Sequence, residues 1–378
     1  MTRFLTEEHH ILQDVLRRYI RTELAPNWKT WEEQRLVPKS VWQDCGRQGF
    51  LCPMVSPEYG GGGTDFRYSY VINWEMARAG LTFRLGLHSD IVVPYIDAFG
   101  TSEQKQKWLP GCVSGDTIAA IAMTEPGTGS DLQSICTTAV RDGDDYIING
   151  QKIFISNGMH CGLVIVACRT GKNAAGRNAL SLIVVEDGTP GFVKTRKLDK
   201  MGLHTQDTAE LVFTDCRVPV KNLLGEENAA FKYLMAKLQV ERLVATIGAM
   251  GLAERILELS VEYAKARQAF GQPIGSFQHN QFKLAEMATE VSLGKSFLDD
   301  LVQSHLDGED IVTKVSMAKW WCTEMVNRIA YHGVQLHGGY GYMEEFEICR
   351  LYRDVRMQTI AAGTTEILKQ TIAKRLGL

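Results

Sequence analysis

The hydrophobic period of this chain changes twice along its length. Apolar residues follow a helical spacing until about Thr117, alternate with polar residues as far as Leu224, and then return to the helical spacing. A helical period buries one stripe of a helix, whereas a period of two buries one face of a strand. The order therefore predicts an α+β fold with three domains, which we bound at residues 1–118, 119–227 and 228–378.

The first domain is expected to be entirely α-helical. Thr6 is a typical N-cap for its first helix, and Pro26 lies beyond the end of that helix. Thr101 is in a similar capping position before the last helix of this domain. Between them, His88 on its own is expected to be a core histidine with satisfied hydrogen bonds. The helical patterns cover residues 6–24, 39–49, 68–79 and 102–108.

The middle domain is expected to be a compact β-barrel or β-sandwich. Residues 146–148 and 152–155 flank Asn149-Gly150, a typical two-residue turn, and predict a β-hairpin. Residues 171–176 are expected to form a flexible surface loop. Further strands are expected at residues 118–123, 164–167, 180–185, 192–194 and 209–213.

The third domain is expected to be a four-helix bundle. Its first helical pattern is longer than a typical globular helix, which favours a bundle. Asp307-Gly308 and His337-Gly338-Gly339 break the pattern. The expected helices span residues 229–267, 278–306, 310–337 and 345–356, with a last one from about residue 364.

Composition excludes several classes of protein. A net charge of -3 without a Lys/Arg block argues against a nucleic-acid partner. Nine cysteines without a C-x-x-C pair predict reduced thiols and no metal site. The chain has no run of 18 apolar residues and no signal or transit peptide pattern. We expect a cytoplasmic protein without a transmembrane segment, or the mature form of a mitochondrial one.

The stretch from Met123 to Asp131, MTEPGTGSD, separates the helical and strand-rich parts. Its proline and two glycines forbid regular structure, and glycine lets a backbone approach a ligand closely. The loop presents bare amides and small hydroxyls, which suit a flat heteroaromatic ring or a phosphate. An ordinary turn would explain the same residues.

Glu241 is the strongest candidate for a catalytic residue, because it lies within an apolar helical stripe. Burial there would raise its pKa and make it a stronger base. The alternative is a glutamate that reaches solvent or pairs with Arg242. The stripe comprises Phe231, Leu234, Met235, Leu238, Ala245, Ala249 and Leu252. Small residues that would leave a groove for a slender chain are Ala245, Gly248, Ala249 and Gly251.

The MTEPGTGSD loop resembles the flavin-contacting loop of the acyl-CoA dehydrogenases, and the resemblance extends from about residue 4 to the end. Most members of that family place the catalytic glutamate just before a Gly-Thr pair near the C-terminus, where this chain has Ala362. The long-chain and isovaleryl branches instead carry the base in a Glu-Arg-Leu motif, which here is Glu241-Arg242-Leu243. The resemblance therefore assigns the base to Glu241.

The resemblance implies an FAD-dependent dehydrogenase that converts a medium- or long-chain acyl-CoA thioester to the trans-2-enoyl-CoA. It also implies electron transfer to an electron-transfer flavoprotein and a homotetramer in which a neighbouring subunit completes the flavin site. The implied cofactor contacts are Met123, Thr124, Ser130, Phe154, Ile155, Ser156, Arg267, Phe270, Gln278, Gln335, Gly338, Gly339, Thr364 and Glu366. The implied thioester contacts are Ser130, Gln239, Arg242, Gly363 and the main-chain N–H of Ala362.

Two departures from the family pattern leave the substrate open. Thr128 replaces the alanine common in the loop, and Ala362 replaces the glycine or glutamate of many relatives. One alternative is a branched-chain or acyl-carrier-protein thioester dehydrogenase or reductase with the same fold. Another is a flavin-binding relative without catalytic activity.

Overall fold

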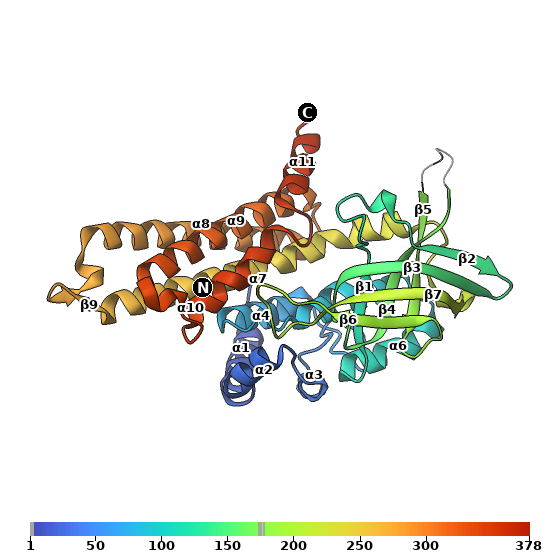
Figure 1. The fold of residues 1–378 in the computed structure, drawn as a ribbon, viewed down its shortest axis with the longest axis horizontal. Coiled ribbons are helices and arrows are strands. Elements are labelled where there is room, and N and C mark those ends of the chain that lie inside the picture. The colour runs from blue at the N-terminus through green and yellow to red at the C-terminus, as the bar shows by residue number, and fades with distance from the viewer. Residues whose placement is uncertain (1–3, 173–175, 177) are drawn as a thin grey trace.

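The computed structural model describes residues 4–172, 176 and 178–378. The molecule is elongated: long helices of the C-terminal part extend away from the sheet, and the N-terminal helices lie beside both (Figure 1). Within these residues, no helix combines the length and the apolar character needed to cross a membrane.

The N-terminal segment is helical, as predicted. Thr6 and Thr101 are the N-caps of α1 and α6, and the backbone N–H of Thr101 donates to the side chain of Gln104 at 2.9 Å. The helix that begins with α1 continues as a wider π-helical segment, Ile20–Leu24. The helices are α1 (Glu7–Tyr19), α2 (Trp28–Gln34), α3 (Lys39–Arg47), α4 (Phe66–Arg78), α5 (Val93–Phe99) and α6 (Ser102–Ser114).

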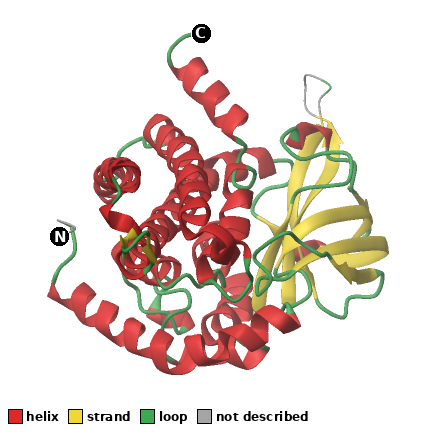
Figure 2. Ribbon diagram, turned by 60° about the vertical axis from the view of Figure 1, so that its left-hand side comes forward, coloured by secondary structure: helices red, strands yellow, loops and turns green. Residues whose placement is uncertain are grey.

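The middle segment is one sheet made of β1 (Ile118–Ala122), β2 (Thr138–Asp142), β3 (Asp145–Ser156), β4 (Cys161–Lys172), β5 (Asn178–Glu186), β6 (Phe192–Lys197), β7 (Thr208–Pro219) and β8 (Leu223–Leu224). The strand order is β6-β7-β3-β2-β4-β5-β8, and β1 pairs with β4 in parallel. Phe192 from β6, Ile148 from β3 and Val185 from β5 share one core, so the sheet curls around it (Figure 2). Of the predicted loop 171–176, residues 171 and 172 belong to β4, and residues 173–175 lie outside the described residues.

The predicted hairpin at Asn149-Gly150 is wrong. Strand β3 passes straight through these residues, and the two-residue turn lies earlier, between the paired Asp142 and Asp145. Gly150 is needed for a close approach instead: a Cβ there would lie 2.7 Å from the Cα of Thr137. Its pairing with β7 also shifts register at this point, which marks a β-bulge.

The C-terminal segment consists of α7 (Ala230–Ala266), α8 (Gln278–Leu306), α9 (Val312–His337), α10 (Glu347–Val355) and α11 (Thr365–Arg375). Three long helices, α7 to α9, form the body of the bundle, and the two short strands β9 (Gln268–Ala269) and β10 (Gln272–Pro273) lie at its tip (Figure 1). Helix α4 packs closely on α7, because a Cβ at Gly251 would lie only 2.7 Å from the Cβ of Ala77. The N-terminal helices are thereby joined to the bundle.

Two apolar cores link the three segments. One combines the N-terminal helices with the outer face of β4 and β5, including Ile165 and Val184. The other combines α4 with the bundle, including Trp74 and Ile247. Because β4 and β5 are buried on both faces, their sequences are almost continuously apolar.

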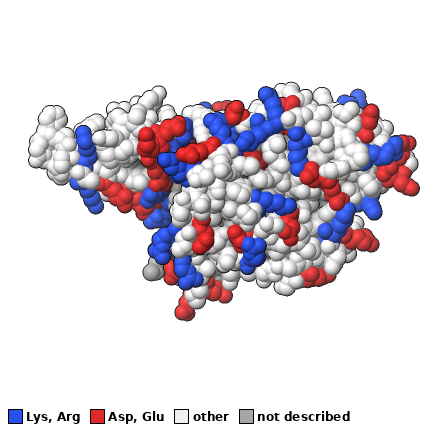
Figure 3. All heavy atoms as spheres, turned by 60° about the horizontal axis from the view of Figure 1, so that its bottom comes forward, with Lys and Arg blue, Asp and Glu red and all other residues white. Residues whose placement is uncertain are grey.

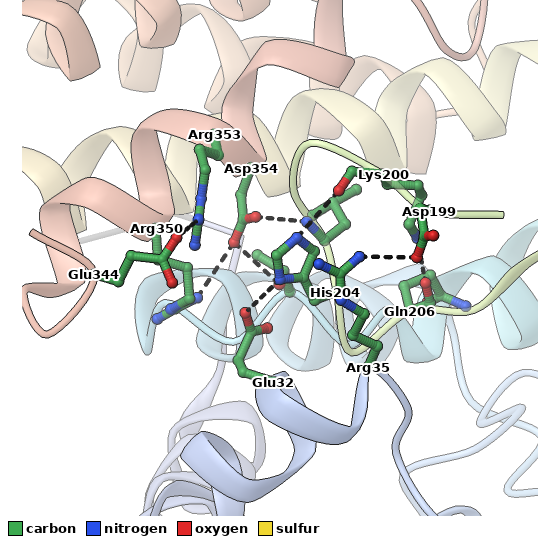
Figure 4. Close-up of polar contacts among 12 residues, drawn as sticks. Glu32, Arg35, Asp199, Lys200, His204, Gln206, Glu344, Arg350, Arg353 and Asp354 are labelled. Atoms are coloured by element: carbon green, nitrogen blue, oxygen red, sulfur yellow. Dashed lines mark hydrogen bonds and ion pairs between the residues drawn. The ribbon is translucent and has the colours of Figure 1, made fainter. Parts of the chain in front are cut away.

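A buried polar cluster also joins the three segments (Figure 4). Asp354 of α10 accepts the backbone N–H of Leu203 at 2.6 Å and pairs with Arg350 at 3.3 Å. Glu32 of α2 lies 3.6 Å from His204, and burial raises the pKa of Glu32 to about 6. The sequence pattern did not indicate this junction, because its members come from distant segments.

The surface carries charges of both signs. Figure 3 shows Lys and Arg side chains interspersed with Asp and Glu on the face drawn, without a single-sign patch. All nine cysteines are free thiols.

Candidate active site

The MTEPGTGSD loop is held on β3 by a buried ion pair. Lys152 of β3 is wholly buried, and its Nζ donates to Glu125 at 2.9 Å and to the carbonyl of Met123 at 3.0 Å. The Glu125 carboxylate also accepts the backbone N–H groups of Cys136 and Thr137. Burial opposes the charge of Glu125, but these hydrogen bonds outweigh it and lower its pKa. The Lys152–Glu125 pair holds the inner side of the loop, and the outer face of the loop takes no part in these contacts.

The outer face of the loop is open. Cβ atoms built on Gly127 and Gly129 would meet no heavy atom within 4 Å. The loop lies next to Phe154, because Ile153 donates its N–H to the carbonyl of Thr124 at 3.0 Å. These residues present exposed amides and hydroxyls beside an exposed strand end.

Strand β3 ends irregularly at the residues predicted to contact a flavin. Phe154 has a φ of 60° and is 64% exposed. Ser156 is partly buried, whereas Ile155 points its side chain into the core of the sheet. The prediction for Ile155 therefore needs correction: only its backbone is free to meet a cofactor. Alternation along the strand sends its side chain to the face opposite Phe154.

Glu241 lies deep in the protein on α7 and remains partly accessible. Burial raises its pKa to about 7, although the nearby cations of Arg242 and Lys319 oppose the shift. Glu241 in turn adds to the effect of burial in raising the pKa of Tyr95, whose buried hydroxyl has no hydrogen-bond partner within the described chain. A carboxylate with a pKa near neutrality is suited to general-base catalysis.

Arg242 turns away from its neighbour towards α9. Its Nη1 lies 3.5 Å from Ser316 Oγ, and its buried Nε has no partner among the described residues. No ion pair joins Glu241 to Arg242 in the described part of the chain, so the alternative of a simple local pair is not adopted. The side chain also lies against Gly363, since a Cβ there would be 3.7 Å from Arg242 Nη2.

The segment that contains Ala362 and Gly363 reaches the same place. Both residues have positive φ values, 57° and 89°. The carbonyl of Gly363 accepts a hydrogen bond of 2.7 Å from Lys319, which is wholly buried on α9. Thr364 then caps α11 by accepting the N–H of Ile367. The predicted thioester contacts Arg242, Ala362 and Gly363 are thus brought together near Glu241.

The space beside Glu241 lies along one face of α7. Gly248 follows Glu241 by about two turns on the same face, and a Cβ there would meet no heavy atom within 4 Å. The predicted groove residues Ala249 and Gly251 do not line this space. Ala249 is wholly buried in the bundle core, and Gly251 is packed against α4.

Other members of the predicted stripe point elsewhere. Phe231 and Met235 are exposed, whereas Leu234 is buried in the core of the N-terminal helices. Gln239 donates to the carbonyl of Met235 at 3.3 Å, and its buried Oε1 has no partner within the described chain. This orphaned amide oxygen, two residues before Glu241 in the sequence, is available to a ligand.

A second group of predicted cofactor contacts lies at the tip of the bundle, far from the sheet (Figure 1). Arg267 follows the end of α7, and its guanidinium lies 5.7 Å from the ring centre of Tyr340. Phe270 is 95% exposed. The rest of this group is Gln278 at the start of α8, Gln335 near the end of α9, and Gly338 and Gly339 after it. Within one chain this group does not meet the loop at Met123.

Thr364 and Glu366 belong to neither group. They begin α11, and the next hydroxyl, Thr365 Oγ1, donates to Glu324 of α9 at 2.7 Å. Glu366 is exposed. The N–H groups at this helix start are oriented to favour an anion, although Thr364 already accepts that of Ile367.

Sequence reasoning missed Glu125, Lys152, Lys319 and Tyr95. Lys152 and Lys319 carry the signal that could have found two of them, since each is a lysine within an otherwise apolar pattern. Their partners are distant in sequence, so the pattern alone could not name them.

Comparison with known proteins agrees with this geometry. Three family descriptions match in order: "Acyl-CoA dehydrogenase, N-terminal domain" at residues 6–116, the middle domain at 120–216 and the C-terminal domain at 228–377. The long-chain specific acyl-CoA dehydrogenase of Mus musculus is 44% identical over 377 residues, covering 99% of this chain and 87% of that protein. The chain belongs to the acyl-CoA dehydrogenase family. It is an oxidoreductase of that family, and the resemblance seen in the sequence is confirmed.

Solved structures show the same acyl-CoA dehydrogenase fold. The acyl-CoA dehydrogenase of Geobacillus kaustophilus superimposes with a TM-score of 0.97 at 54% identity, covering 100% of both chains. An acyl-CoA dehydrogenase of Bacillus anthracis complexed with FAD gives a TM-score of 0.92 at 31% identity, covering 99% of this chain and 68% of that one. The predicted fold class is therefore confirmed.

Proposed function

We propose that this chain is an FAD-dependent dehydrogenase of medium- or long-chain acyl-CoA thioesters that forms the trans-2-enoyl-CoA. The observation that carries the proposal is Glu241, a buried base whose pKa of about 7 suits proton abstraction, beside an open face of α7. The long-chain relative at 44% identity supports the substrate class.

The residues present fit a bound flavin. The loop from Met123 to Ser130 offers free backbone next to an exposed strand end, and Gly127 and Gly129 have open space around them. On the thioester side, Arg242 and Gln239 keep buried polar atoms without partners inside the described chain. When bound, FAD would supply the acceptor for the β-hydride.

The protein's own residues abstract the proton, polarise the thioester and exclude water. Glu241 takes the α-proton, because its carboxylate is ionised at pH values above its pKa of about 7 and burial makes it more basic than an exposed one. The main-chain N–H of Ala362 donates to the thioester oxygen and stabilises the charge that develops there. Arg242 orients this region from α7. Apolar packing around α7 excludes water.

We also propose that a second copy of the chain completes each flavin site. The tip group around Arg267 lies far from the loop at Met123 in one chain, so a neighbouring subunit would have to bring them together (Figure 1). Large apolar side chains on the bundle surface are suited to such an interface. Exposed examples are Phe270, Phe282, Leu293, Tyr331 and Tyr342. The family's homotetramer is the assembly we propose.

The electrons would pass from the flavin to an electron-transfer flavoprotein, as the resemblance implies. The exposed ring of Phe154 at the end of β3 supports an exit on that side. The nine free thiols favour a reducing compartment, and we propose the cytoplasm.

An anaerobic flavin-reduction experiment tests the proposal. The purified protein with bound FAD is mixed with saturated acyl-CoA thioesters of increasing chain length, with isovaleryl-CoA and with an acyl-carrier-protein thioester. Medium- or long-chain acyl-CoA should bleach the flavin fastest. If the branched or carrier-protein thioester bleaches the flavin fastest, that thioester is the substrate class instead. If no thioester bleaches it, the protein binds flavin but lacks this activity.

A further inference from the structure

Lys319 is buried in a place where a lysine is costly. Its side chain is wholly buried in the middle of α9, and its Nζ has a carbonyl, that of Gly363 at 2.7 Å, as its hydrogen-bond acceptor. Burial lowers its pKa to about 8, and the nearby cations Arg242 and Arg84 lower it further against the opposing charges of Glu241 and Glu324. A lysine is almost never fully buried without a paired charge, so this one has a specific task.

The carbonyl that Lys319 holds belongs to a strained segment. Ala362 and Gly363 are consecutive residues with positive φ, and alanine in this region of backbone space is uncommon. Such a conformation persists only where surrounding contacts determine it. The 2.7 Å bond from Lys319 fixes the peptide that follows Gly363. It therefore anchors the C-terminal end of this two-residue segment, whose N-terminal end carries the Ala362 N–H.

Helix α9 supplies the neighbouring contacts. Ser316 meets Arg242, Lys319 meets Gly363, and Glu324 accepts the hydroxyl of Thr365. Ser316 and Lys319 are three residues apart and lie on the same side of the helix, whereas Glu324 lies further round it. Helix α9 thus anchors both the end of the strained segment and the arginine that follows Glu241. Among these contacts, Lys319 is the wholly buried cation within electrostatic reach of Glu241.

We propose that Lys319 is a positioning residue for the dehydrogenation. It holds the Ala362–Gly363 segment so that the Ala362 N–H points at the thioester oxygen, and its positive charge favours the ionised form of Glu241. This inference rests on the proposed function and adds a residue that touches neither substrate nor cofactor.

The first test follows the segment itself. In Lys319→Met, hydrogen–deuterium exchange at the amides of residues 360–364 should speed up by at least about tenfold, since a charge-assisted hydrogen bond is lost. Lys314→Met is the matched control, because Lys314 lies on the same helix and pairs with Asp300 and Ser304 away from the site. The control should leave exchange at residues 360–364 unchanged. Lys319→Arg, which keeps the donor and the charge, should restore protection.

The second test is the pH dependence of kcat/KM, which reports groups of the free enzyme. Glu241 must be ionised to accept a proton, and the Lys319 cation lowers its pKa. Removing that cation in Lys319→Met raises the pKa of Glu241, so the acidic limb of the profile should move to higher pH. Arg242 and Tyr95, the other groups that face Glu241, are unchanged. The parent should also lose activity above pH 8 as Lys319 deprotonates. The variant should lack that second limb.

A loss of oxyanion positioning adds a drop in kcat of ~10-fold to ~100-fold at the pH optimum, with KM changed little. A general loosening of the fold would expose Glu241 and move the acidic limb to lower pH, so a shift to higher pH separates positioning from stability. If an active parent and its Lys319→Met variant share the same exchange rates and the same pH profile, the Lys319 proposal is overturned and the proposed function stands. If the parent reduces flavin with no thioester, the proposed function itself is overturned and the proposal with it.

Discussion

At the scale of single residues, burial has opposite consequences for groups that differ in their partners. His88 donates from Nε2 to the carbonyl of Cys112 and accepts the N–H of Ala119 at Nδ1, each at 2.9 Å. Both ring nitrogens are satisfied by a neutral ring, so His88 is the core histidine that was predicted. Glu241 is also set deep in the protein but remains partly accessible, and it has no hydrogen-bonded partner among the described residues, so its carboxylate is left available for a reaction.

Replacing Glu241 with glutamine tests the base. Glutamine keeps the shape of the side chain but cannot accept a proton, so flavin reduction by an acyl-CoA should slow by ~10²- to ~10⁴-fold. FAD content should stay at the parental level. Stopped-flow absorbance after mixing with substrate measures the rate, and a parental rate in Glu241→Gln means that another residue is the base.

A double variant tests whether the catalytic base can be moved from position 241 to position 362. Adding Ala362→Glu to Glu241→Gly places a carboxylate where most members of the family carry it. Part of the activity should return, with an altered chain-length preference, because small displacements near the reacting atom change rates strongly. Glu241→Gly alone is the control and should remain inactive.

His88 predicts an acid-sensitive contribution to stability. Burial lowers its folded-state pKa from 6.5 to about 4, so on acidification the unfolded chain takes up a proton that the folded chain refuses. The contribution is present above the unfolded pKa and is lost between these two values, by up to about 3 kcal/mol. Thermal unfolding of the parent and of His88→Gln at about pH 7 and about pH 5 measures it. The variant is expected to be less stable at neutral pH but to lose less on acidification, and equal losses would contradict the assignment.

At the scale of elements, the faces of α7 decide where a substrate chain can lie. Gly251 and Ala249 are used for packing, whereas Gly248 faces open space on the side of Glu241. Sequence spacing grouped these small residues together, but neighbouring positions on a helix point in different directions. The open face is therefore narrower than the pattern predicted.

Filling that face should change chain-length preference. Gly248→Leu introduces a branched side chain where no heavy atom lies nearby, so folding should be little affected. Long acyl-CoA substrates should lose more kcat/KM than short ones, because the added side chain occupies the path of the tail. Ala249→Leu is the control for overpacking, since Ala249 is wholly buried, and it should lower stability without changing preference. Equal losses at all lengths in Gly248→Leu would place the tail elsewhere.

At the scale of the whole molecule, the proposed flavin site depends on assembly. The loop at Met123 follows β1 in the sheet, whereas the tip group around Arg267 lies beside β9 at the far end of the bundle, although both resemble cofactor contacts (Figure 1). Arg267 has no role in the core of its own chain, because its side chain is exposed and contacts Tyr340. The partner proposed for this exposed guanidinium is a ligand held by another copy.

Arg267→Ala should therefore release flavin without unfolding the monomer. The expected result is a lower FAD-to-protein ratio after gel filtration, with an unchanged far-ultraviolet circular dichroism spectrum. Arg47→Ala is the matched control, since Arg47 is an exposed arginine of the N-terminal helices paired with Asp44. Full flavin retention in Arg267→Ala would show that the tip group serves another purpose.

The sequence by itself determined the order of helical and strand segments, the caps at Thr6 and Thr101, and the position of Glu241 within an apolar stripe. These features are local, because periodicity and capping depend on residues a few positions apart. The hairpin at Asn149-Gly150 failed because the tertiary structure uses Gly150 for close contact with Thr137, and a turn signal is indistinguishable from a bulge at that range. Only the tertiary structure decided which small residues of α7 face open space, and only it joined Lys152 to Glu125 and Lys319 to Gly363. Those pairs are 27 and 44 residues apart in sequence, and a buried charge finds its partner through the packing of whole elements.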